Sequence, residues 1–350
     1  MNHEIKIGNR VLNNDSQTYI IAEMSGNHNM DYNRAVKIVE AAKEAGADAI
    51  KLQTYTADTI TLNSDAPCFQ ITQGTLWDGT TLHKLYEEAY TPWDWQPKLK
   101  ELANSLGMDC FSSPFDFTSV DFLEKMDVPA YKIASFEITD IPLIKKVAKT
   151  GKPVIISTGI ATVEDIELAL KTCKEAGNEN VILLKCSSAY PAPYESINLN
   201  TMVDMAEKFG CIMGLSDHTM GSAVSIAAVA MGAKVIEKHL TLARADGGVD
   251  AAFSMEPAEF KEMVEGIRNV EKAKGIVSYD LTDKQKSQRT FSRSLFIAAD
   301  IKAGEILTPE NLRSVRPANG LHTKYYEELL GRKVTRDCKY GEPMSWDMVE

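Results

Sequence analysis

Short apolar runs alternate with longer amphipathic stretches along the first three quarters of the chain. The apolar runs are rich in β-formers and predict buried strands. They lie at residues 18–25, 48–55, 108–115, 130–135, 152–159, 181–188, 212–219 and 234–241. Stretches between them, such as 33–47 and 162–178, repeat apolar residues at helical spacing and stop at Gly, and a last helix is predicted near 256–273.

This alternation of strands and helices is typical of an α/β fold, the (β/α)8 or TIM barrel. One long insertion, residues 57–92, follows the second strand, where such barrels carry active-site loops. We predict a barrel domain over residues 1–274, a polar linker over 275–290 and a compact β-rich domain over 291–350. A domain of about 60 residues is marginal as an independent fold, so we expect it to pack on another surface, as a lid would.

Composition and charge exclude several classes of protein. The chain has no apolar run long enough for a membrane span and no amino-terminal leader pattern, so we expect a soluble, cytoplasmic protein. Its 6 cysteines form no C-x-x-C pair, which indicates reduced thiols. A net charge of -11 argues against a broad surface for nucleic acid or anionic membranes. Any bound anion must therefore be held by a few local cations.

Polar residues gather at the carboxyl ends of the predicted strands. The set comprises Glu23, Lys51, Gln53, Ser113, Lys132, Ser135, Ser157, Ser188, Tyr190, Ser216, His218, Glu237 and His239. Because the carboxyl ends of the strands form the catalytic face of a barrel, we expect one cavity to hold these side chains.

Two histidines end neighbouring predicted strands, His218 in SDHT and His239 in EKHLT. Neighbouring strands lie about 4.8 Å apart, so imidazoles at matching heights could bind one ion. A histidine in a strand is more often an ordinary core or surface residue, and the spacing does not decide between the two interpretations. Two nitrogens with nearby carboxylates would suit Mn²⁺, Co²⁺, Zn²⁺ or Mg²⁺.

Two lysines, Lys51 and Lys132, lie on nonadjacent predicted strands. A barrel lysine can form a Schiff base, act as a point charge for phosphate or carboxylate, or extend from a strand end to solvent. Strand-end hydroxyls at Ser135, Ser157 and Ser216 fit an anion cradle better than a single nucleophile.

Taken together, the motifs resemble the sialic acid synthase (NeuB-like) family, whose members are barrel enzymes with a carboxyl-terminal antifreeze-like (SAF) domain. The motifs that carry the resemblance are IIAEMSGNHN, KLQTY, SSPFD, YKIAS, STGIAT, YPAP, GLSDHT, EKHLT and VRPANG. The resemblance implies a transferase that condenses phosphoenolpyruvate with an open-chain N-acylated amino sugar. The products would be a nine-carbon 3-deoxy-2-ulosonic acid and phosphate, formed with C–O cleavage and no covalent lysine intermediate.

The resemblance also implies roles for individual residues. His218 and His239 would bind the divalent metal (Mn²⁺, Co²⁺ or Mg²⁺), and Glu23 would organise water or sugar hydroxyls and join in proton transfer. Phosphoenolpyruvate would bind Lys51, Lys132, Ser135, Ser157, Ser188 and Ser216. The sugar would face Gln53, Ser113, Glu137, Tyr190 and Asp250. Arg316, in VRPANG, implies a domain-swapped homodimer in which this arginine reaches the partner's active site.

The choice of sugar rests on two segments. The insertion at 74–96 resembles the pseudaminic acid synthase branch more than the N-acetylneuraminate branch, and Ser188 stands where N-acetylneuraminate and legionaminate synthases usually have Asn. The expected substrate is therefore 2,4-diacetamido-2,4,6-trideoxy-L-altrose, whose methyl and acetamido groups favour an apolar, aromatic-lined pocket. Trp77, Trp93 and Phe253 are candidates for that lining, unless they only pack around the barrel rim.

Three alternatives remain at this point. One is an N-acetylneuraminate or legionaminate synthase of the same family. A second is another phosphoenolpyruvate-dependent 3-deoxy-ulosonate synthase, which would need a second phosphate site for a phosphorylated sugar; no extra Arg cluster provides one. The third is a noncatalytic carbohydrate-binding protein, which would not need both histidines and both lysines at the barrel mouth.

Overall fold

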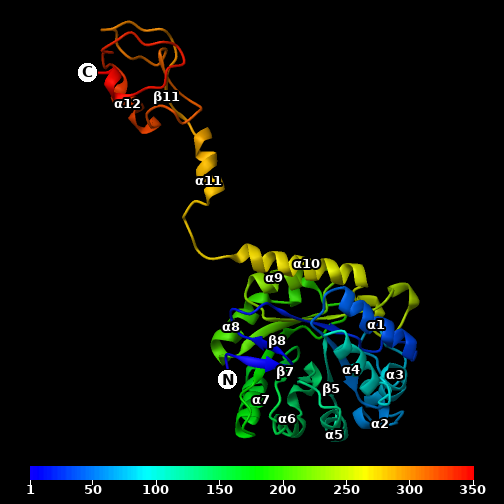
Figure 1. The fold of residues 1–350 in the computed structure, drawn as a ribbon. Coiled ribbons are helices and arrows are strands. Elements are labelled where there is room, and N and C mark those ends of the chain that lie inside the picture. Colours follow the sequence, from blue (N-terminus) through cyan, green and yellow to red (C-terminus); the bar gives the residue numbers. More distant parts are fainter. The chain divides into compact units, whose positions relative to one another are not determined.

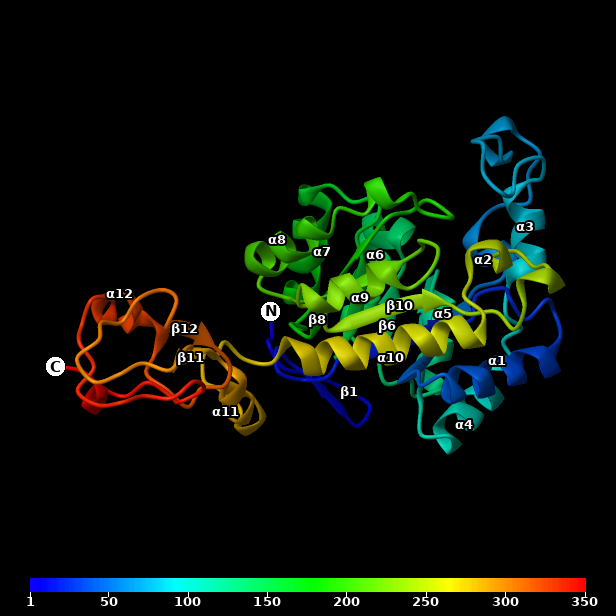
Figure 2. The ribbon, with the colours of Figure 1, turned by 90° about the horizontal axis from the view of Figure 1, so that it is seen from above.

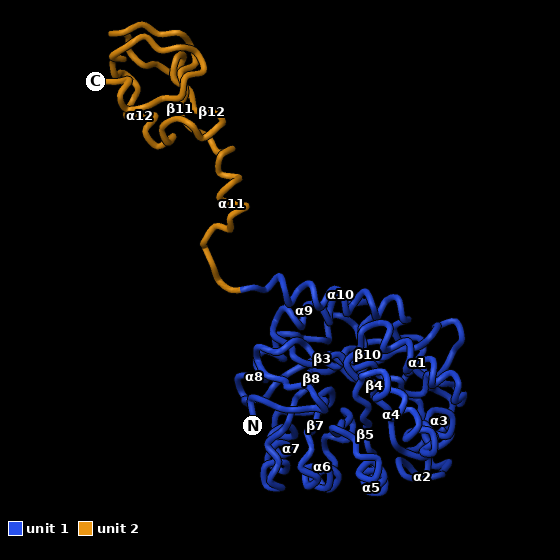
Figure 3. Tube along the Cα trace, in the orientation of Figure 1, with its two compact units in different colours: residues 1–275 blue, residues 276–350 orange.

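The computed structural model describes residues 1–350, and the chain divides into two compact units, residues 1–275 and 276–350 (Figure 3). The first unit contains the barrel and the second contains a small antiparallel sheet. No helix combines the length and the apolar character that crossing a membrane requires.

The first unit is a closed barrel of parallel strands in the order β10-β3-β4-β5-β6-β7-β8-β9 (Figures 1 and 2). Its strands are β3 (Tyr19–Glu23), β4 (Ala49–Thr54), β5 (Asp109–Pro114), β6 (Tyr131–Ile133), β7 (Val154–Ser157), β8 (Val181–Cys186), β9 (Ile212–Asp217) and β10 (Val235–His239). Each lies inside one of the predicted segments. The (β/α)8 prediction is confirmed.

One long helix follows each barrel strand, after the insertion in the case of β4. These helices are α1 (Tyr32–Glu44), α4 (Gln96–Ser105), α5 (Phe117–Lys125), α6 (Ile141–Ala148), α7 (Val163–Glu175), α8 (Leu199–Phe209), α9 (Ala223–Ala230) and α10 (Pro257–Lys274). Several begin at a side-chain cap: Asp31 accepts hydrogen bonds from two backbone N–H groups of α1, and Thr162 forms a capping box with Asp165. The insertion contributes the shorter α2 (Ala57–Ile60) and α3 (Leu82–Ala89).

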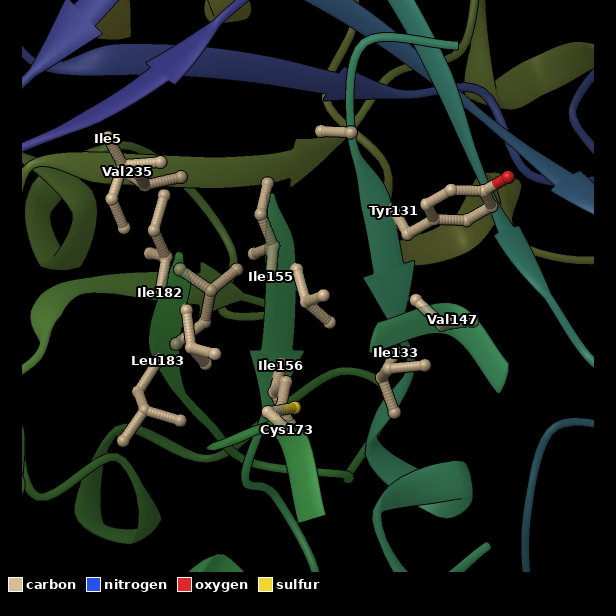
Figure 4. Packing of buried hydrophobic residues seen from close by; sticks show 14 of the residues in the cluster. Ile5, Tyr131, Ile133, Val147, Ile155, Ile156, Cys173, Ile182, Leu183 and Val235 are labelled. Atoms are coloured by element: carbon tan, nitrogen blue, oxygen red, sulfur yellow. The ribbon is translucent and has the colours of Figure 1, made fainter. Parts of the chain in front are cut away.

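The barrel strands are buried on both faces, which explains why they read as continuous apolar runs. Figure 4 shows Ile155 and Ile156 of β7 beside Ile182 and Leu183 of β8. All four are at most 1% exposed. This packing fixes the strands whose carboxyl ends carry the polar side chains.

An amino-terminal hairpin, β1 (Ile5–Ile7) and β2 (Arg10–Leu12), was not predicted, because two strands of 3 residues are too short to show a pattern. It contacts residues at the amino ends of barrel strands. Arg10 binds Asp48 at 2.7 Å, and the turn at Gly8 (φ +53) lies so close to Asp109 that a Cβ there would fall 2.1 Å from Oδ1. The hairpin therefore closes the amino-terminal end of the barrel.

The second unit has a core of its own. It contains α11 (Asp283–Gln288), β11 (Ser294–Ile297), β12 (Leu312–Val315) and α12 (Tyr326–Leu329). Leu295, Leu312 and Val334 are among its buried residues. The segment predicted as linker, 275–290, includes α11, which begins at a capping box between Thr282 and Gln285. No residue of that helix is buried, so its sequence carried no apolar periodicity.

Candidate active site

A cavity of about 420 Å³ opens among the carboxyl ends of the barrel strands. It brings together most of the side chains singled out in the sequence. Those lining it are Lys51, Gln53, Lys132, Ser135, Glu137, Ser157, Tyr190, Ser216, His218, Glu237, His239 and Asp250. Further lining residues come from the insertion, among them Ile71, Trp77, Leu82 and Leu85.

Three expected site residues do not line the cavity but contact residues that do. Glu23 is fully buried and pairs with Lys51, Ser113 accepts a hydrogen bond from Lys51 Nζ at 3.4 Å, and Ser188 donates to Ser135 Oγ at 2.9 Å. Arg316 belongs to the second unit and is exposed.

A buried network of four charged groups forms the floor of the cavity. Lys51 Nζ lies 2.6 Å from Glu23 Oε2 and 3.7 Å from Glu237 Oε1, which is itself 3.6 Å from Lys132 Nζ. Each side chain is at most 4% exposed. Glu237 is a residue to which the sequence analysis gave no role, although it marked the position as a polar strand end. The two lysines and the two glutamates balance one another when all four are charged. Protonation of one carboxyl group therefore leaves a net positive charge that can attract a bound anion.

The pKa values show which carboxyl group that is. Burial raises the pKa of Glu23 to about 7, although Lys51 opposes the shift. Burial also disfavours the charge on Glu237. The attraction of Lys132 and Lys51 outweighs this effect of burial and holds the pKa of Glu237 below its ordinary value. Lys51 is kept charged in the same way, since Glu23 and Glu237 overcome the effect of burial and raise its pKa. Of the two carboxyl groups in this network, Glu23 is therefore the one that exchanges a proton near neutral pH.

Hydroxyl groups and a glycine form an open cradle beside the lysines. Ser135 Oγ accepts hydrogen bonds from Ser188 Oγ at 2.9 Å and from the backbone N–H of Ile160 at 3.1 Å. A Cβ at Gly159 would lie 2.3 Å from Ser188 Oγ and 2.6 Å from Ser135 Oγ, so only glycine leaves this space free. The hydroxyl of Ser157 is buried without a hydrogen-bond partner. These donors have the chemistry of a site for phosphate or carboxylate.

The two histidine rings line the cavity side by side and meet edge to face, with centroids 5.2 Å apart and ring planes at 62°. His218 Nδ1 lies 3.1 Å from the carbonyl oxygen of Ser187. A carbonyl can only accept, so Nδ1 carries the proton and Nε2 keeps its lone pair. Burial lowers the pKa of His218 to about 4 and, together with His218, lowers that of His239. Both rings are therefore neutral, the form that binds metal.

The donor set fits a divalent ion that shares its coordination with other molecules. No group of three or more His, Cys, Asp or Glu side chains is arranged to bind a metal ion by itself. His239 Nδ1 is buried without a hydrogen-bond partner, 3.8 Å from Asp250 Oδ2. Two imidazoles would leave the remaining positions to water or substrate oxygen, as catalytic rather than structural sites do.

Aromatic residues at the rim differ in part from the prediction. Trp77 lines the cavity and donates its indole N–H to the carbonyl of Val249 at 2.9 Å, which links the insertion to the loop after β10. Phe253 packs behind the histidines, 5.0 Å from the His239 ring. Neither Phe253 nor Trp93 lines the cavity, so of the two interpretations the packing one holds for them: the Trp93 ring packs on Phe122, and its N–H donates to the carbonyl of Tyr55.

Comparison with known proteins identifies the family. A model of the NeuB family matches residues 38–279, and a model of the SAF domain matches residues 292–350. The chain belongs to the NeuB family.

Relatives of this NeuB-family chain are similar over almost its whole length. Pseudaminic acid synthase from Campylobacter jejuni subsp. jejuni serotype O:2 is 47% identical over 340 residues, which are 97% of this chain and 98% of that protein. N,N'-diacetyllegionaminic acid synthase from the same strain is 39% identical over 330 residues, 93% and 98% of the two proteins. The crystal structure of N-acetylneuraminic acid (sialic acid) synthetase from Leptospira borgpetersenii serovar Hardjo-bovis, in complex with citrate, has a TM-score of 0.73 and 30% identity. It covers 81% of this chain and 94% of that chain.

A further site residue of this NeuB-family chain was not predicted. Ser25 lies two residues beyond β3 with φ 47 and donates a hydrogen bond to Asp250. Gln53 donates to Ser25 Oγ at 3.2 Å and to Glu23 Oε1 at 2.9 Å. Ser25 thus joins the ends of the first and second barrel strands to the loop that follows the eighth. The only signal in the sequence was its position just after a strand end.

Glu137 gives a prediction about stability and pH. Burial raises the pKa of Glu137 from 4.5 to about 7, with Lys132 opposing, and its Oε2 is buried without a partner. Since the folded protein binds this proton more tightly than the unfolded chain, stability is lost as pH rises from about 4.5 to about 7. We expect Glu137→Gln to be more stable than the wild type at pH 8, by about 3 kcal/mol, but nearly equal at pH 5.

Urea unfolding at the two pH values measures this difference. Glu167→Gln, on the exposed face of α7, is the matched control. The difference in unfolding free energy between this variant and the wild type should be the same at pH 5 and pH 8. A gain of the same size at pH 5 and pH 8 would contradict the ionisation argument.

Proposed function

We propose that this protein is a pseudaminic acid synthase. It condenses phosphoenolpyruvate with 2,4-diacetamido-2,4,6-trideoxy-L-altrose to a nine-carbon nonulosonic acid and phosphate, as a transferase. The observation that carries the proposal is one cavity lined by two buried lysines and two neutral histidines, with Glu23, whose pKa is about 7, paired to Lys51 behind the lining. The identity of 47% to a pseudaminic acid synthase, against 39% to the legionaminic acid synthase, favours this sugar.

Lys51 and Lys132 neutralise the phosphate and carboxylate of phosphoenolpyruvate. The hydroxyls of Ser135, Ser157 and Ser216 and the open space at Gly159 complete the cradle, which Ser188 supports through Ser135. Groups fixed in advance around a developing charge stabilise the transition state without reorganising during the reaction. This cradle also fixes C3 of the enol toward the sugar aldehyde, which removes much of the entropic cost of the encounter.

His218 and His239 would hold a divalent ion, Mn²⁺, Co²⁺ or Mg²⁺. When bound there, such an ion supplies Lewis-acid chemistry, which makes an aldehyde more electrophilic without a proton. The bond that forms joins C3 of the enol to the aldehyde carbon, whose oxygen then takes up a proton. A water adds at C2 and loses one proton, which balances the proton taken up by the aldehyde oxygen. Phosphate then departs with the electron pair of its own bond to C2, and the remaining hydroxyl at C2 loses its proton to become the keto group.

Glu23 serves the proton transfers in this sequence. Its pKa of about 7 lets the same carboxyl group accept and return a proton at neutral pH. Its position against Lys51 couples that exchange to the charge of the bound phosphate, since the ammonium group at 2.6 Å is shared between carboxylate and anion. Gln53 holds the other oxygen of Glu23 at 2.9 Å and so fixes the carboxyl plane.

The sugar occupies the outer part of the cavity, against Gln53, Glu137, Tyr190 and Asp250, with Ser113 behind them. Ile71, Leu82 and Leu85 of the insertion, with Trp77, give this part an apolar wall suited to a 6-deoxy methyl group and to acetamido methyl groups. An N-acetylmannosamine chain would place a hydroxyl there, where these side chains offer it no hydrogen bond.

We also place Arg316 in the reaction, donated by a second copy of the chain in a domain-swapped homodimer. Within its own chain Arg316 is exposed and makes neither a hydrogen bond nor an ion pair, so its guanidinium group is available to a phosphate. It would add a third cation to the two lysines.

A panel of sugars tests the proposed function. The purified protein is incubated with phosphoenolpyruvate, Mn²⁺ and each open-chain-capable acetamido sugar, and the ulosonic acid is detected by mass. We expect product and phosphate with 2,4-diacetamido-2,4,6-trideoxy-L-altrose, and none after chelation of the metal. Reaction with N-acetylmannosamine alone would show that the sugar assignment is wrong, and no phosphate release with any sugar would favour the carbohydrate-binding alternative.

A further inference from the structure

A buried ion pair lies on the outer face of the two strands that carry the histidines. Lys238 Nζ is 2.8 Å from Asp217 Oδ2, with side-chain exposures of 1% and 0%. Side chains alternate along a strand, so Asp217 and Lys238 point away from the cavity while the neighbouring Ser216, Glu237 and His239 line it. None of the roles proposed above uses this pair.

The carboxylate of Asp217 is fully occupied. Its Oδ1 accepts hydrogen bonds from the backbone N–H of Thr219 at 2.9 Å and from its hydroxyl at 2.8 Å. Its Oδ2 accepts a third from Ser225 of α9 at 2.7 Å, in addition to the bond from Lys238. Lys238 Nζ also donates to the carbonyl of Thr219 at 2.5 Å. The pair therefore holds the backbone on both sides of His218.

The strand ladder does not hold His218 in place. The hydrogen-bonded pairing of β9 with β10 ends at Asp217 and Lys238, so His218 lies one residue beyond β9. His239, in contrast, is still inside β10 and pairs with Glu23 of β3. The position of His218 relative to His239 thus depends on contacts other than the ladder. The N–H of Ala192 donates to the His218 carbonyl at 2.9 Å and Ser187 binds the ring, while the bonds of Asp217 and Lys238 fix the residues on either side.

Stability is a weak explanation for this pair. Removing two charges from water carries a large desolvation cost, and apolar residues of similar volume often replace a buried ion pair without loss of stability. What an ion pair provides better than apolar packing is a single geometry, because its hydrogen bonds have fixed directions.

We propose that Asp217 and Lys238 are positioning residues for the histidine pair. Their ion pair fixes the segment 217–219 so that the ring of His218 lies beside that of His239 at the separation needed to bind one divalent ion. This inference rests on the metal role given to the histidines under the proposed function. It concerns neither the identity of the sugar nor the chemistry of the substrates.

The experiment measures binding of Mn²⁺ to the full-length protein without substrate. Free Mn²⁺ is followed by electron paramagnetic resonance during titration of the wild type, of Lys238→Met and of a control, Arg268→Met. The control breaks a partly buried ion pair with Asp48, at 3.1 Å, at the opposite end of the barrel. Thermal unfolding of each protein is recorded in parallel.

We expect Lys238→Met to raise the Kd for Mn²⁺ by about tenfold or more, the usual effect of removing an outer support of a metal ligand. Arg268→Met should keep the wild-type Kd even if its melting temperature falls. With saturating substrates, the kcat of Lys238→Met should recover as Mn²⁺ is increased, while the KM for phosphoenolpyruvate stays near that of the wild type. A purely structural role would not produce this recovery.

Each outcome decides the matter. A folded Lys238→Met protein with the wild-type Kd overturns the inference alone, whereas a wild type that binds no Mn²⁺ overturns the metal assignment and this inference together. If Lys238→Met does not fold, Asp217→Asn replaces it, since it removes the charge but keeps an oxygen for the N–H of Thr219. The same weakening of Mn²⁺ binding is then expected, and a wild-type Kd again overturns the inference.

Discussion

Replacing His218 with alanine is expected to lower phosphate release from phosphoenolpyruvate by about 1,000-fold or more, because the metal site that we propose would keep only one of its two imidazoles and lose its Lewis acid. The barrel should remain folded. His218 lies beyond the end of β9, and the main structural loss is its hydrogen bond to the carbonyl of Ser187, which costs about 1–3 kcal/mol. Phosphate release at saturating substrates, with circular dichroism on the same samples, measures both effects.

The exposed His3, which lies outside the cavity, provides the control for this measurement. His3→Ala should keep the turnover of the wild type at every Mn²⁺ concentration. If His218→Ala also turned over within about tenfold of the wild type, the histidine pair would not be the metal site, because loss of a ligand costs more than that. The contact between the rings would then be only a packing arrangement.

The second large effect is expected for Lys51→Met. We expect kcat/KM for phosphoenolpyruvate to fall by about 1,000-fold or more, since a preorganised cation in a water-excluded site contributes several kcal/mol to transition-state stabilisation. Stability should fall as well, by about 3 kcal/mol at pH 8, because Glu23 and Glu237 lose the ammonium group they share. Steady-state kinetics and urea unfolding measure the two effects.

The pH dependence separates lost charge pairing from lost packing. The pKa of Glu23 is already raised by burial, and without Lys51 it rises further, so the variant binds a proton more tightly when folded. Its destabilisation should therefore be smallest at pH 5 and grow toward pH 8. Lys234→Met removes a lysine that precedes β10 and binds the carbonyl of Ser16 outside the cavity, and it should leave the kinetics unchanged. A pH-independent loss of stability in Lys51→Met would contradict the charge network.

Much of the fold and part of the site could be predicted because one physical fact governs both. Strands buried on both faces must be apolar until they leave the barrel, so a polar residue at the end of such a run marks the mouth. Lys51, Lys132, His218 and His239 were found in this way, and all four line the cavity. The same reasoning located Glu237 without showing that it lies between two lysines.

The other features could not be predicted, because they depend on contacts between segments that are far apart in the sequence or on segments without a clear pattern. Asp217 and Lys238 stand 21 residues apart, and their pairing follows from the register of two strands. Trp93 and Trp77 cannot be told apart from the sequence, since both lie in or just after the insertion. In the fold, the indole N–H of Trp93 donates to the carbonyl of Tyr55 and the ring packs on Phe122. The hairpin at Ile5–Leu12 was too short to be recognised, and α11 too polar.

The closed amino-terminal end of the barrel has a kinetic consequence. Because the hairpin covers that end, the lysines are reached through the cavity at the mouth, which the insertion and Trp77 border. In the arrangement that we propose, phosphoenolpyruvate lies at the floor of the cavity and the sugar above it, so we expect phosphoenolpyruvate to bind first. For the same reason, we expect inorganic phosphate to leave after the nine-carbon acid, which would give the enzyme an ordered kinetic mechanism.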